Sequence, residues 1–130
     1  MERITATYNL KPISLAVVLT YKDRMKKEGI LFSDKAEYFC LYVNDQAVGF
    51  YGVKWAGRSA TFKCDWTMPN NRRQGHLYMA TILRLARCKE RGVKTVYANC
   101  TPMAFGTHRK LGAKIVKRYK NGVVRVKYEL

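Results

Sequence analysis

The spacing of hydrophobic residues changes its period several times along the chain of 130 residues. Residues 3–10 alternate weakly and are rich in Thr, Ile and Tyr, which predicts an edge strand. After Pro12 the hydrophobic positions follow helical spacing, which predicts a helix that has Pro12 in its first turn and ends at Gly29. The period of two then returns in three segments, which predict an antiparallel meander of residues 38–43, 48–55 and 60–67.

A second helical period covers residues 77–91, and Gly92 is expected to end this helix. We expect Arg84 on its polar face, and an apolar face made of Met79, Ile82, Leu83 and Ala86. Residues 93–100 again have the pattern of a strand. Because strand-helix-strand crossovers are right-handed, this strand is predicted to lie parallel to residues 60–67.

The C-terminal segments predict a short helix and a hairpin. Residues 102–111 have the pattern of a helix ended by Gly112, and residues 114–119 and 123–129 flank the turn pair Asn121-Gly122. No repeat or linker interrupts the chain. The sequence therefore predicts one mixed α/β (α+β) domain over residues 1–130, with a mostly antiparallel central sheet of about six to seven strands and three to four helices.

The charge of the chain limits the classes of molecule that it is expected to bind. There are 25 Lys and Arg against 9 Asp and Glu, a formal net charge of +16, and the basic residues are spread along the sequence. Such a charge favours polyanions, including nucleic acid, nucleotide cofactors and anionic membranes, although a generally basic surface without a specific use has the same composition. Nearly half of the residues are apolar, which excludes a disordered chain.

The cysteine spacing, the N-terminal segment and the lengths of the apolar runs indicate in which cellular compartment the protein is expected. No spacing typical of a zinc ribbon, a redox motif or another metal site occurs, so free buried thiols and no metal are expected. The N-terminus lacks the apolar segment of a signal peptide, and no charge-free run has membrane-spanning length. We therefore expect a cytoplasmic protein without membrane contact. The four cysteines are Cys40, Cys64, Cys88 and Cys100.

The loop before the second predicted helix, PNNRRQGHLYMA at residues 69–80, is polar and basic, and contains one glycine. Unpaired backbone N–H groups converge at a helix start, and they bind phosphate there. The run Arg72-Arg73-Gln74-Gly75-His76-Leu77 resembles the phosphate loop Arg/Gln-x-x-Gly-x-Gly/Ala of the GNAT superfamily of acyl-CoA-dependent N-acyltransferases. A second similar segment is formed by Asn99 with Leu111-Gly112-Ala113.

The resemblance covers nearly the whole chain and implies a GNAT-like fold and a cofactor, acetyl-CoA or another acyl-CoA. Two positions depart from the family pattern. Leu77 stands where a Gly or Ala lets pyrophosphate approach the helix, and His108 stands where many members have the tyrosine that protonates the leaving thiolate. The resemblance implies cofactor binding by Thr67, Arg72, Arg73, Gln74, Gly75, His76, Leu77 and Asn99.

Two residues are candidates for proton transfer. An ordinary imidazole titrates near the range that is useful for a thiolate, so His108 is a candidate proton donor, with a surface helix histidine as the alternative. Asp65 lies within an apolar strand directly before the phosphate loop. It is a candidate base for the amine or a contact to the acceptor, and the alternative is a solvent-facing residue paired with a lysine.

The function that these features favour is N-acylation of an amine by an acyl-CoA. Because the chain is basic, the acceptor is expected on or near nucleic acid: a DNA base, as in the Mom-like phage adenine modifiers, an aminoacyl-tRNA, or a basic nucleic-acid-associated protein. The alternative is a non-enzymatic, basic GNAT-fold module that binds nucleic acid or an acidic protein. A small-amine or peptide acetyltransferase is a third possibility, and the oligomeric state stays open.

Overall fold

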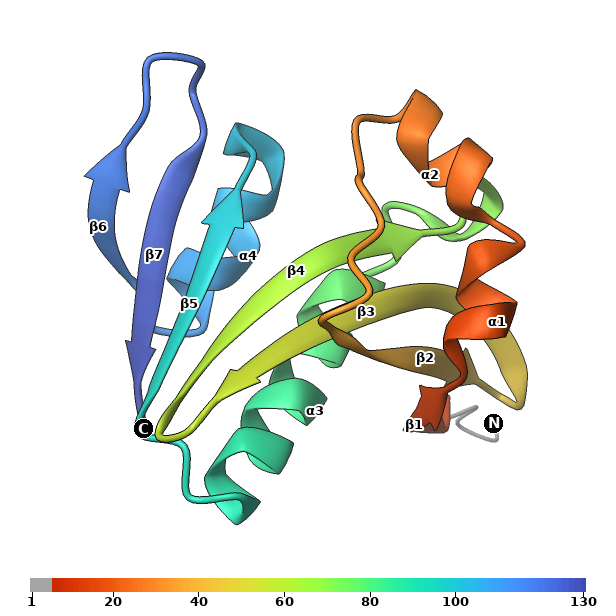
Figure 1. The fold of residues 1–130 in the computed structure, drawn as a ribbon, viewed down its shortest axis with the longest axis horizontal. Helices are drawn as coiled ribbons and strands as arrows, with labels where there is room; N and C mark the ends of the chain where they lie inside the picture. The colour runs from red at the N-terminus through yellow and green to blue at the C-terminus, as the bar shows by residue number, and fades with distance from the viewer. Residues whose placement is uncertain (1–5) are drawn as a thin grey trace, which may run out of the picture.

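The computed structural model describes residues 6–130, and its centre is a mixed sheet of seven strands in the order β1-β2-β3-β4-β5-β7-β6 (Figure 1). All neighbouring strands are antiparallel except β4 and β5, which are parallel. The strands are β1 (Tyr8–Ile13), β2 (Glu37–Val43), β3 (Gln46–Ala56), β4 (Ser59–Thr67), β5 (Thr95–Cys100), β6 (Lys114–Arg118) and β7 (Val124–Glu129).

Helices cover both faces of the sheet, but not evenly. On one face α3 (His76–Glu90) and α4 (Pro102–Lys110) lie behind the strands in Figure 1. On the other face α1 (Leu15–Leu19) and α2 (Lys22–Lys27) lie near the β2–β4 half. None of the described helices in residues 6–130 is long and apolar enough to cross a membrane.

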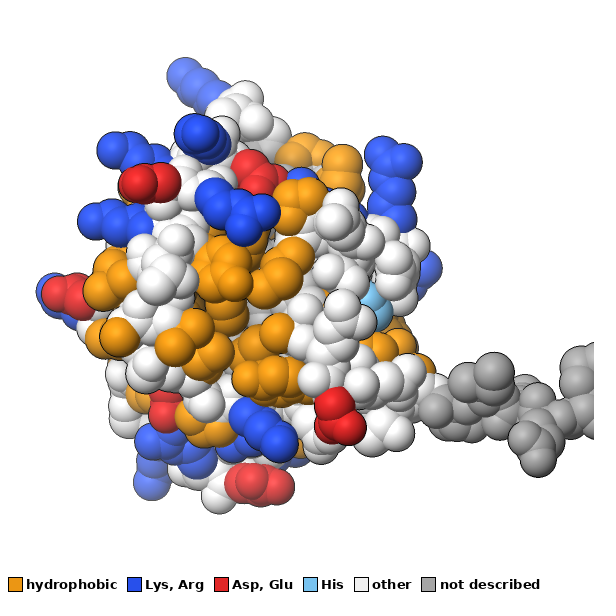
Figure 2. All heavy atoms as spheres, turned by 90° about the vertical axis from the view of Figure 1, so that its right-hand side faces the viewer, with side chains coloured by type: hydrophobic (Ala, Val, Ile, Leu, Met, Phe, Trp, Pro, Cys, Tyr) orange, Lys and Arg blue, Asp and Glu red, His pale blue; other side chains and the backbone are white. Residues whose placement is uncertain are grey.

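The short helix α1 leaves most of its apolar side chains in solvent. Val18 is buried, whereas Leu15, Val17 and Leu19 are exposed. Figure 2 views the side of the molecule that carries β1 and α1, and it shows hydrophobic side chains gathered near the middle, with acidic and basic side chains around them. This side therefore presents a mixed surface with charges of both signs.

The predicted elements of the meander, the parallel crossover and the C-terminal hairpin are confirmed. The N-terminal predictions are partly wrong. Residues 3–5 of the predicted first strand lie outside the described residues, and the strand extends to Ile13, so Pro12 belongs to β1. An edge strand tolerates a proline because one row of its backbone groups needs no partner. The predicted helix after Pro12 is two short helices, and the second ends at Lys27, with Glu28 as its C-cap and the left-handed Gly29 directly after it.

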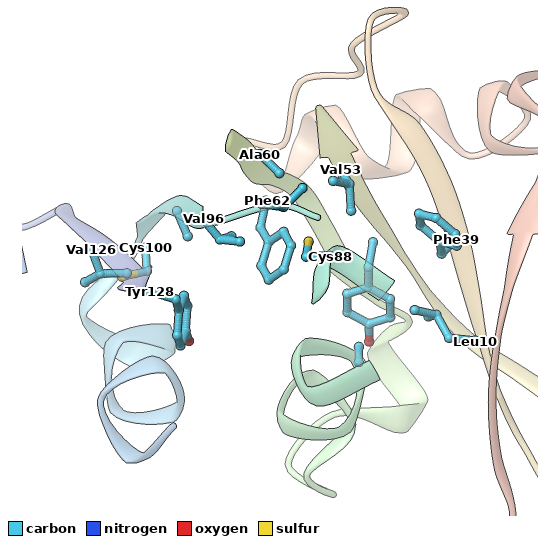
Figure 3. Close-up of a cluster of buried hydrophobic side chains, with 14 of the residues drawn as sticks. Leu10, Phe39, Val53, Ala60, Phe62, Cys88, Val96, Cys100, Val126 and Tyr128 are labelled. Carbon is cyan, nitrogen blue, oxygen red and sulfur yellow. The ribbon is translucent and has the colours of Figure 1, made fainter. Parts of the chain in front are cut away.

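The main core lies between the sheet and the pair α3 and α4. Figure 3 shows Phe62 and Val96 in the middle of this cluster, with Phe39 and Leu10 on one side and Tyr128, Cys100 and Val126 on the other. A second cluster on the opposite face joins Val18 and Met25 to strand residues such as Phe50 and Trp66. The four cysteines are free, and all but Cys64 are buried.

The face of α3 that packs on the sheet is not the predicted one. Arg84, expected on the polar face, is completely buried, whereas Ala86 is exposed. Hydrophobic spacing misassigned this face because Arg84 has a counter-charge in the fold: its guanidinium donates 2.7 and 2.9 Å bonds to the two carboxylate oxygens of Asp65 and a 3.1 Å bond to the carbonyl of Gly52. Its Nε is buried without a hydrogen-bond partner among the described residues. The buried residues of α3 are His76, Ala80, Thr81, Arg84 and Cys88.

We predict that Asp65→Ala lowers the free energy of unfolding by about 3 kcal/mol, because it leaves the Arg84 guanidinium buried without its counter-charge. Urea unfolding monitored by circular dichroism measures this. The double variant Asp65→Ala/Arg84→Met is expected to recover much of the loss, since no unpaired charge remains in the core.

The matched control is Glu37→Ala, which removes the carboxylate of the exposed Arg91–Glu37 pair at 3.4 Å. It is expected to destabilise the protein much less than Asp65→Ala. Equal effects of the two truncations, or a double variant as unstable as the sum of the single ones, would contradict the structural role of the Arg84–Asp65 pair.

Candidate functional site

The strands β4 and β5 separate at one end of the sheet. Their parallel pairing joins residues 59–62 to residues 95–98 and stops there. Figure 1 shows the two strands diverging beyond this point. The facing edges of residues 63–67 and 99–100 therefore carry backbone groups without a ladder between them. We call this ladder-free part of the sheet the opening; it lies at the end of β4 that leads into the loop before α3.

A β-bulge in β4 determines which side chains face this opening. Lys63 pairs with Gly52 and Trp66 with Phe50, so Cys64 and Asp65 together lie opposite Tyr51. Cys64 has a φ of +60°, in the left-handed region. Because one extra residue reverses the alternation of the strand, Asp65 lies toward α3 and Trp66 packs in the cluster on the opposite face.

The start of α3 carries free backbone donors. Gly75, the N-cap, has a φ of +79°, and Arg73 also lies in the left-handed region at +63°. Within residues 6–130, no hydrogen bond uses the N–H groups of His76, Leu77 or Tyr78, and the first helical bond runs from the Met79 N–H to the Gly75 carbonyl at 3.1 Å. Three unpaired N–H groups at the positive end of a 15-residue helix form an anion-binding arrangement.

The side chains of the loop do not all face the anion position. Leu77 packs against the main core, so its bulk is accommodated there while its N–H stays at the helix start. The ring of His76 is buried beside Tyr8, at 6.2 Å between ring centroids, and its Nε2 lies 3.2 Å from Gln74 Oε1. Burial lowers the pKa of His76 below its ordinary value. His76 and Leu77 thus offer the site backbone donors only.

The two arginines of the loop differ in whether their side chains are already paired with other residues. Arg72 forms an ion pair with Glu28 at the end of α2, and its Nε donates a 2.9 Å bond to the carbonyl of Thr67. Glu28 also accepts a 2.6 Å bond from Trp66 Nε1, and this bond, with Arg72 and Arg24, holds the pKa of Glu28 below its ordinary value. Arg73 is exposed. Arg72 therefore ties α2 to the loop, and Arg73 is the arginine available to an anion.

His108 is in the protein interior, so the expected alternative of a surface histidine is wrong. Its side chain is 2% exposed, and Nδ1 lies 2.5 Å from the hydroxyl of Tyr128. Burial lowers the pKa of His108, while the charges of Asp65 and Arg84 act on this pKa in opposite directions. The alternative for Asp65, a pair with a lysine, is also wrong, because Arg84 is its partner.

The remaining predicted residues lie on the two strands that flank the opening. The hydroxyl of Thr67 in β4 is 2.6 Å from that of Tyr51, whose pKa burial raises to about 12. In β5, Asn99 is exposed, and its Oδ1 accepts a 3.2 Å bond from Arg125. The guanidinium of Arg125 lies 4.7 Å over the ring of Tyr97. This sheet face therefore carries a polar, aromatic and basic group beside the opening.

Sequence reasoning missed Glu28, Arg84 and Tyr128. Their partners lie 44, 19 and 20 residues away, so no local spacing connects them, and Arg84 and Tyr128 appear as ordinary helix and strand residues. A carboxylate inside an apolar strand was the one signal that a buried cation had to exist. Among the described residues, no group of three or more His, Cys, Asp or Glu side chains is arranged to hold a metal ion.

Comparison with known proteins identifies the fold. The ribosomal-protein-S18-alanine N-acetyltransferase from Escherichia coli superposes with a TM-score of 0.77 at 13% identity, over 95% of this chain and 94% of that one. A GNAT family acetyltransferase from Elizabethkingia anophelis with acetyl-CoA bound gives 0.69 at 14%, over 95% and 98%. A Bacillus subtilis acetyltransferase in complex with CoA gives 0.71 at 12%, over 97% and 99%.

No protein-family model and no curated protein sequence matches the chain. The structural likeness extends over nearly the full length of these neighbours, so the seven-stranded mixed sheet with its four helices has the GNAT fold. At identities of 13%, 14% and 12% it is the fold that is shared.

We predict that the two histidines make the protein less stable in mild acid. Burial lowers the pKa of both His76 and His108, so each binds a proton less readily in the folded chain than in the unfolded one. Their contribution is complete above an unfolded pKa of about 6.5 and is lost as the pH falls below it. Urea midpoints at about pH 7.5 and about pH 5.5 measure the difference.

Because these are the only histidines, the variant His76→Gln/His108→Gln is expected to lose most of this pH dependence, whatever its absolute stability. A drop between the two pH values that is as large in the variant as in the wild type would assign the effect to other groups.

Proposed function

We propose that the protein is an acyl-CoA-dependent N-acyltransferase. The observation that carries the proposal is the position of the free N–H groups of residues 76–78 at the start of α3, directly beside the opening between β4 and β5. A helix start binds a pyrophosphate, and the separated strand edges offer backbone partners to an extended amide-containing arm. The neighbours from Elizabethkingia anophelis and Bacillus subtilis, which contain acetyl-CoA and CoA, support this ligand.

Different residues of the chain would bind different parts of the acyl-CoA. The N–H groups of residues 76–78 and the exposed side chains of Arg73 and Gln74 hold the pyrophosphate, and Gly75 provides the left-handed turn that aims these donors. Thr67 and Asn99 flank the pantetheine arm from β4 and β5. Arg72 acts through the position of the loop, because it is bonded to Glu28 and to the Thr67 carbonyl.

An acyl-CoA supplies the acyl group as an activated thioester. Backbone N–H groups after the bulge in β4 stabilise the oxyanion that develops on the carbonyl. His108, hydrogen-bonded to Tyr128, is the proposed proton donor to the departing sulfur: it takes up the proton that the attacking amine nitrogen loses and passes it to the sulfur as the C–S bond breaks. Asp65 contacts the incoming amine at the mouth of the opening. Arg84 is a positioning residue, since it holds both oxygens of Asp65 in one orientation.

For the acceptor we propose an amine carried on nucleic acid or on a nucleic-acid-associated molecule: a DNA base, as in Mom-like adenine modification, an aminoacyl-tRNA, or a basic protein. The net charge of +16 and the basic residues beside the opening, such as Arg125, support this class. The alternative function is a non-enzymatic basic binding module. Two observations favour that alternative: Arg72 is already paired with Glu28 instead of being free for a phosphate, and His108 is buried away from a substrate.

We predict that the wild type binds acetyl-CoA in isothermal titration calorimetry and that Gly75→Glu weakens binding at least about tenfold, because a carboxylate at the helix start repels pyrophosphate. Gly92→Glu is the matched control. Gly92 ends the same helix, has a similar φ of +77°, and has the same open space for a side chain. It is expected to bind like the wild type. No binding by the wild type, or equal losses in the two variants, would refute the cofactor site.

We also predict that DNA or tRNA from cells expressing the wild type carries an added acyl mass in mass spectrometry. His108→Gln is expected to lower the rate of acylation about a hundredfold, since it removes the proton donor, and to leave the Kd for acetyl-CoA unchanged. Tyr128→Phe, which keeps the packing and removes the hydroxyl next to His108, is the comparison. If acetyl-CoA binds but no nucleic acid is modified, the acceptor is a protein or a small amine instead. If His108→Gln acylates at the wild-type rate, His108 is a structural residue and not the proton donor.

A further inference from the structure

The C-terminal part of the chain concentrates positive charge. Residues 109–130 contain eight Lys and Arg and a single acidic residue, Glu129, which is paired with Lys127. All five residues of β6 are exposed. The side shown in Figure 2 differs, because acidic side chains accompany the basic ones there. These 22 residues therefore carry a net charge of +7, from 8 basic residues less 1 acidic residue, out of the +16 of the whole chain.

A groove runs along this basic region between α4 and β6, with a volume of about 390 Å³. Its lining alternates in character: three side chains are cationic and three are apolar. Among residues 6–130, none of the residues that line it is acidic. Figure 1 shows β6 at the outer edge of the sheet and α4 behind β5 and β7. The lining residues are Phe105, Arg109, Ala113, Lys114, Ile115 and Arg118.

The ligand that fits this lining is anionic and has flat apolar parts. Three cations without a carboxylate among them attract repeated phosphates, and Phe105 with Ile115 offers an apolar surface of the kind that stacks with bases. On either side of Arg118 in the chain, the ammonium of Lys117 lies 5.1 Å from the ring of exposed Tyr119. Such surfaces need unpaired bases, because a duplex keeps its base faces stacked inside. The chemistry is that of a single-stranded nucleic acid.

We propose that the groove between α4 and β6 binds single-stranded nucleic acid, with phosphates on Arg109, Lys114 and Arg118 and bases against Phe105 and Ile115. This deepens the proposed function, and rests on it, by locating the polymer that carries the acceptor. Binding itself requires no acyl-CoA. The groove is formed by α4 and β6, whereas the anion position belongs to the start of α3, so the two sites are separable by mutation.

The test is fluorescence anisotropy of a short labelled oligothymidylate over a series of salt concentrations. The triple variant Arg109→Gln/Lys114→Gln/Arg118→Gln is expected to lower affinity at least about tenfold and to reduce the slope of log K against log salt by about 2, from roughly 0.7 for each lost phosphate contact. The matched control Lys22→Gln/Lys26→Gln/Lys27→Gln removes the same charge from α2 and is expected to keep the wild-type slope.

Base contact is tested with Phe105→Leu, which keeps an apolar side chain in the core contact and removes the aromatic face. It is expected to weaken oligothymidylate about fivefold or more and to leave heparin binding unchanged. The proposal would be overturned if the wild type did not bind oligothymidylate, or if the two triple variants lost the same affinity for it. It would also be overturned if heparin or a duplex bound as tightly as the single strand. Acetyl-CoA titration of the same proteins distinguishes failure of this proposal from failure of the proposed function. If the groove does not bind nucleic acid but acetyl-CoA still binds, the proposed acyltransferase activity is not refuted.

Discussion

The extra residue in β4 is the constraint on which the site depends. With Cys64 in the left-handed region, the strand reverses its alternation, so Ala60 and Phe62 face α3 before the bulge and Asp65 faces it after the bulge. The same reversal sends Trp66 to the other face, where it meets Glu28 of the α2 end. One local irregularity therefore supplies a carboxylate to one side of the sheet and an indole to the other, at the point where β4 leaves β5.

The carboxylate and the buried guanidinium require each other. Arg84 has no exposure to solvent, and its stability in the core depends on the two oxygens of Asp65, the carbonyl of Gly52 and the ring of Phe62 at 4.1 Å. His108 and Tyr128 form a second buried pair, joined by a 2.5 Å hydrogen bond between Nδ1 and the hydroxyl.

The anion position and the basic groove use charge in different ways. At the start of α3 the donors are backbone N–H groups, which hold their orientation through the helix and through the left-handed turn at Gly75. At α4 and β6 the donors are long side chains, whose attraction acts over a Debye length and weakens with salt. The first arrangement is the one that we propose for a single pyrophosphate, and the second is the one that we propose for a polymer with repeated phosphates.

The sequence by itself determined the order and type of most elements, because their signals are local: the turn pair Asn121-Gly122, the left-handed glycines Gly92 and Gly112, and the changes of hydrophobic period. It also located the glycine loop before α3, where Gly75 lies in the left-handed region. Only the tertiary structure decided the buried face of α3, the interior position of His108 and the ties of Arg72 to Glu28 and Asp65 to Arg84. These depend on partners 19 to 44 residues apart, and hydrophobicity treats a charged residue as exposed unless its counter-charge is known. The physical reason is that burial of an ion depends on its pair, and a pair is a property of the fold.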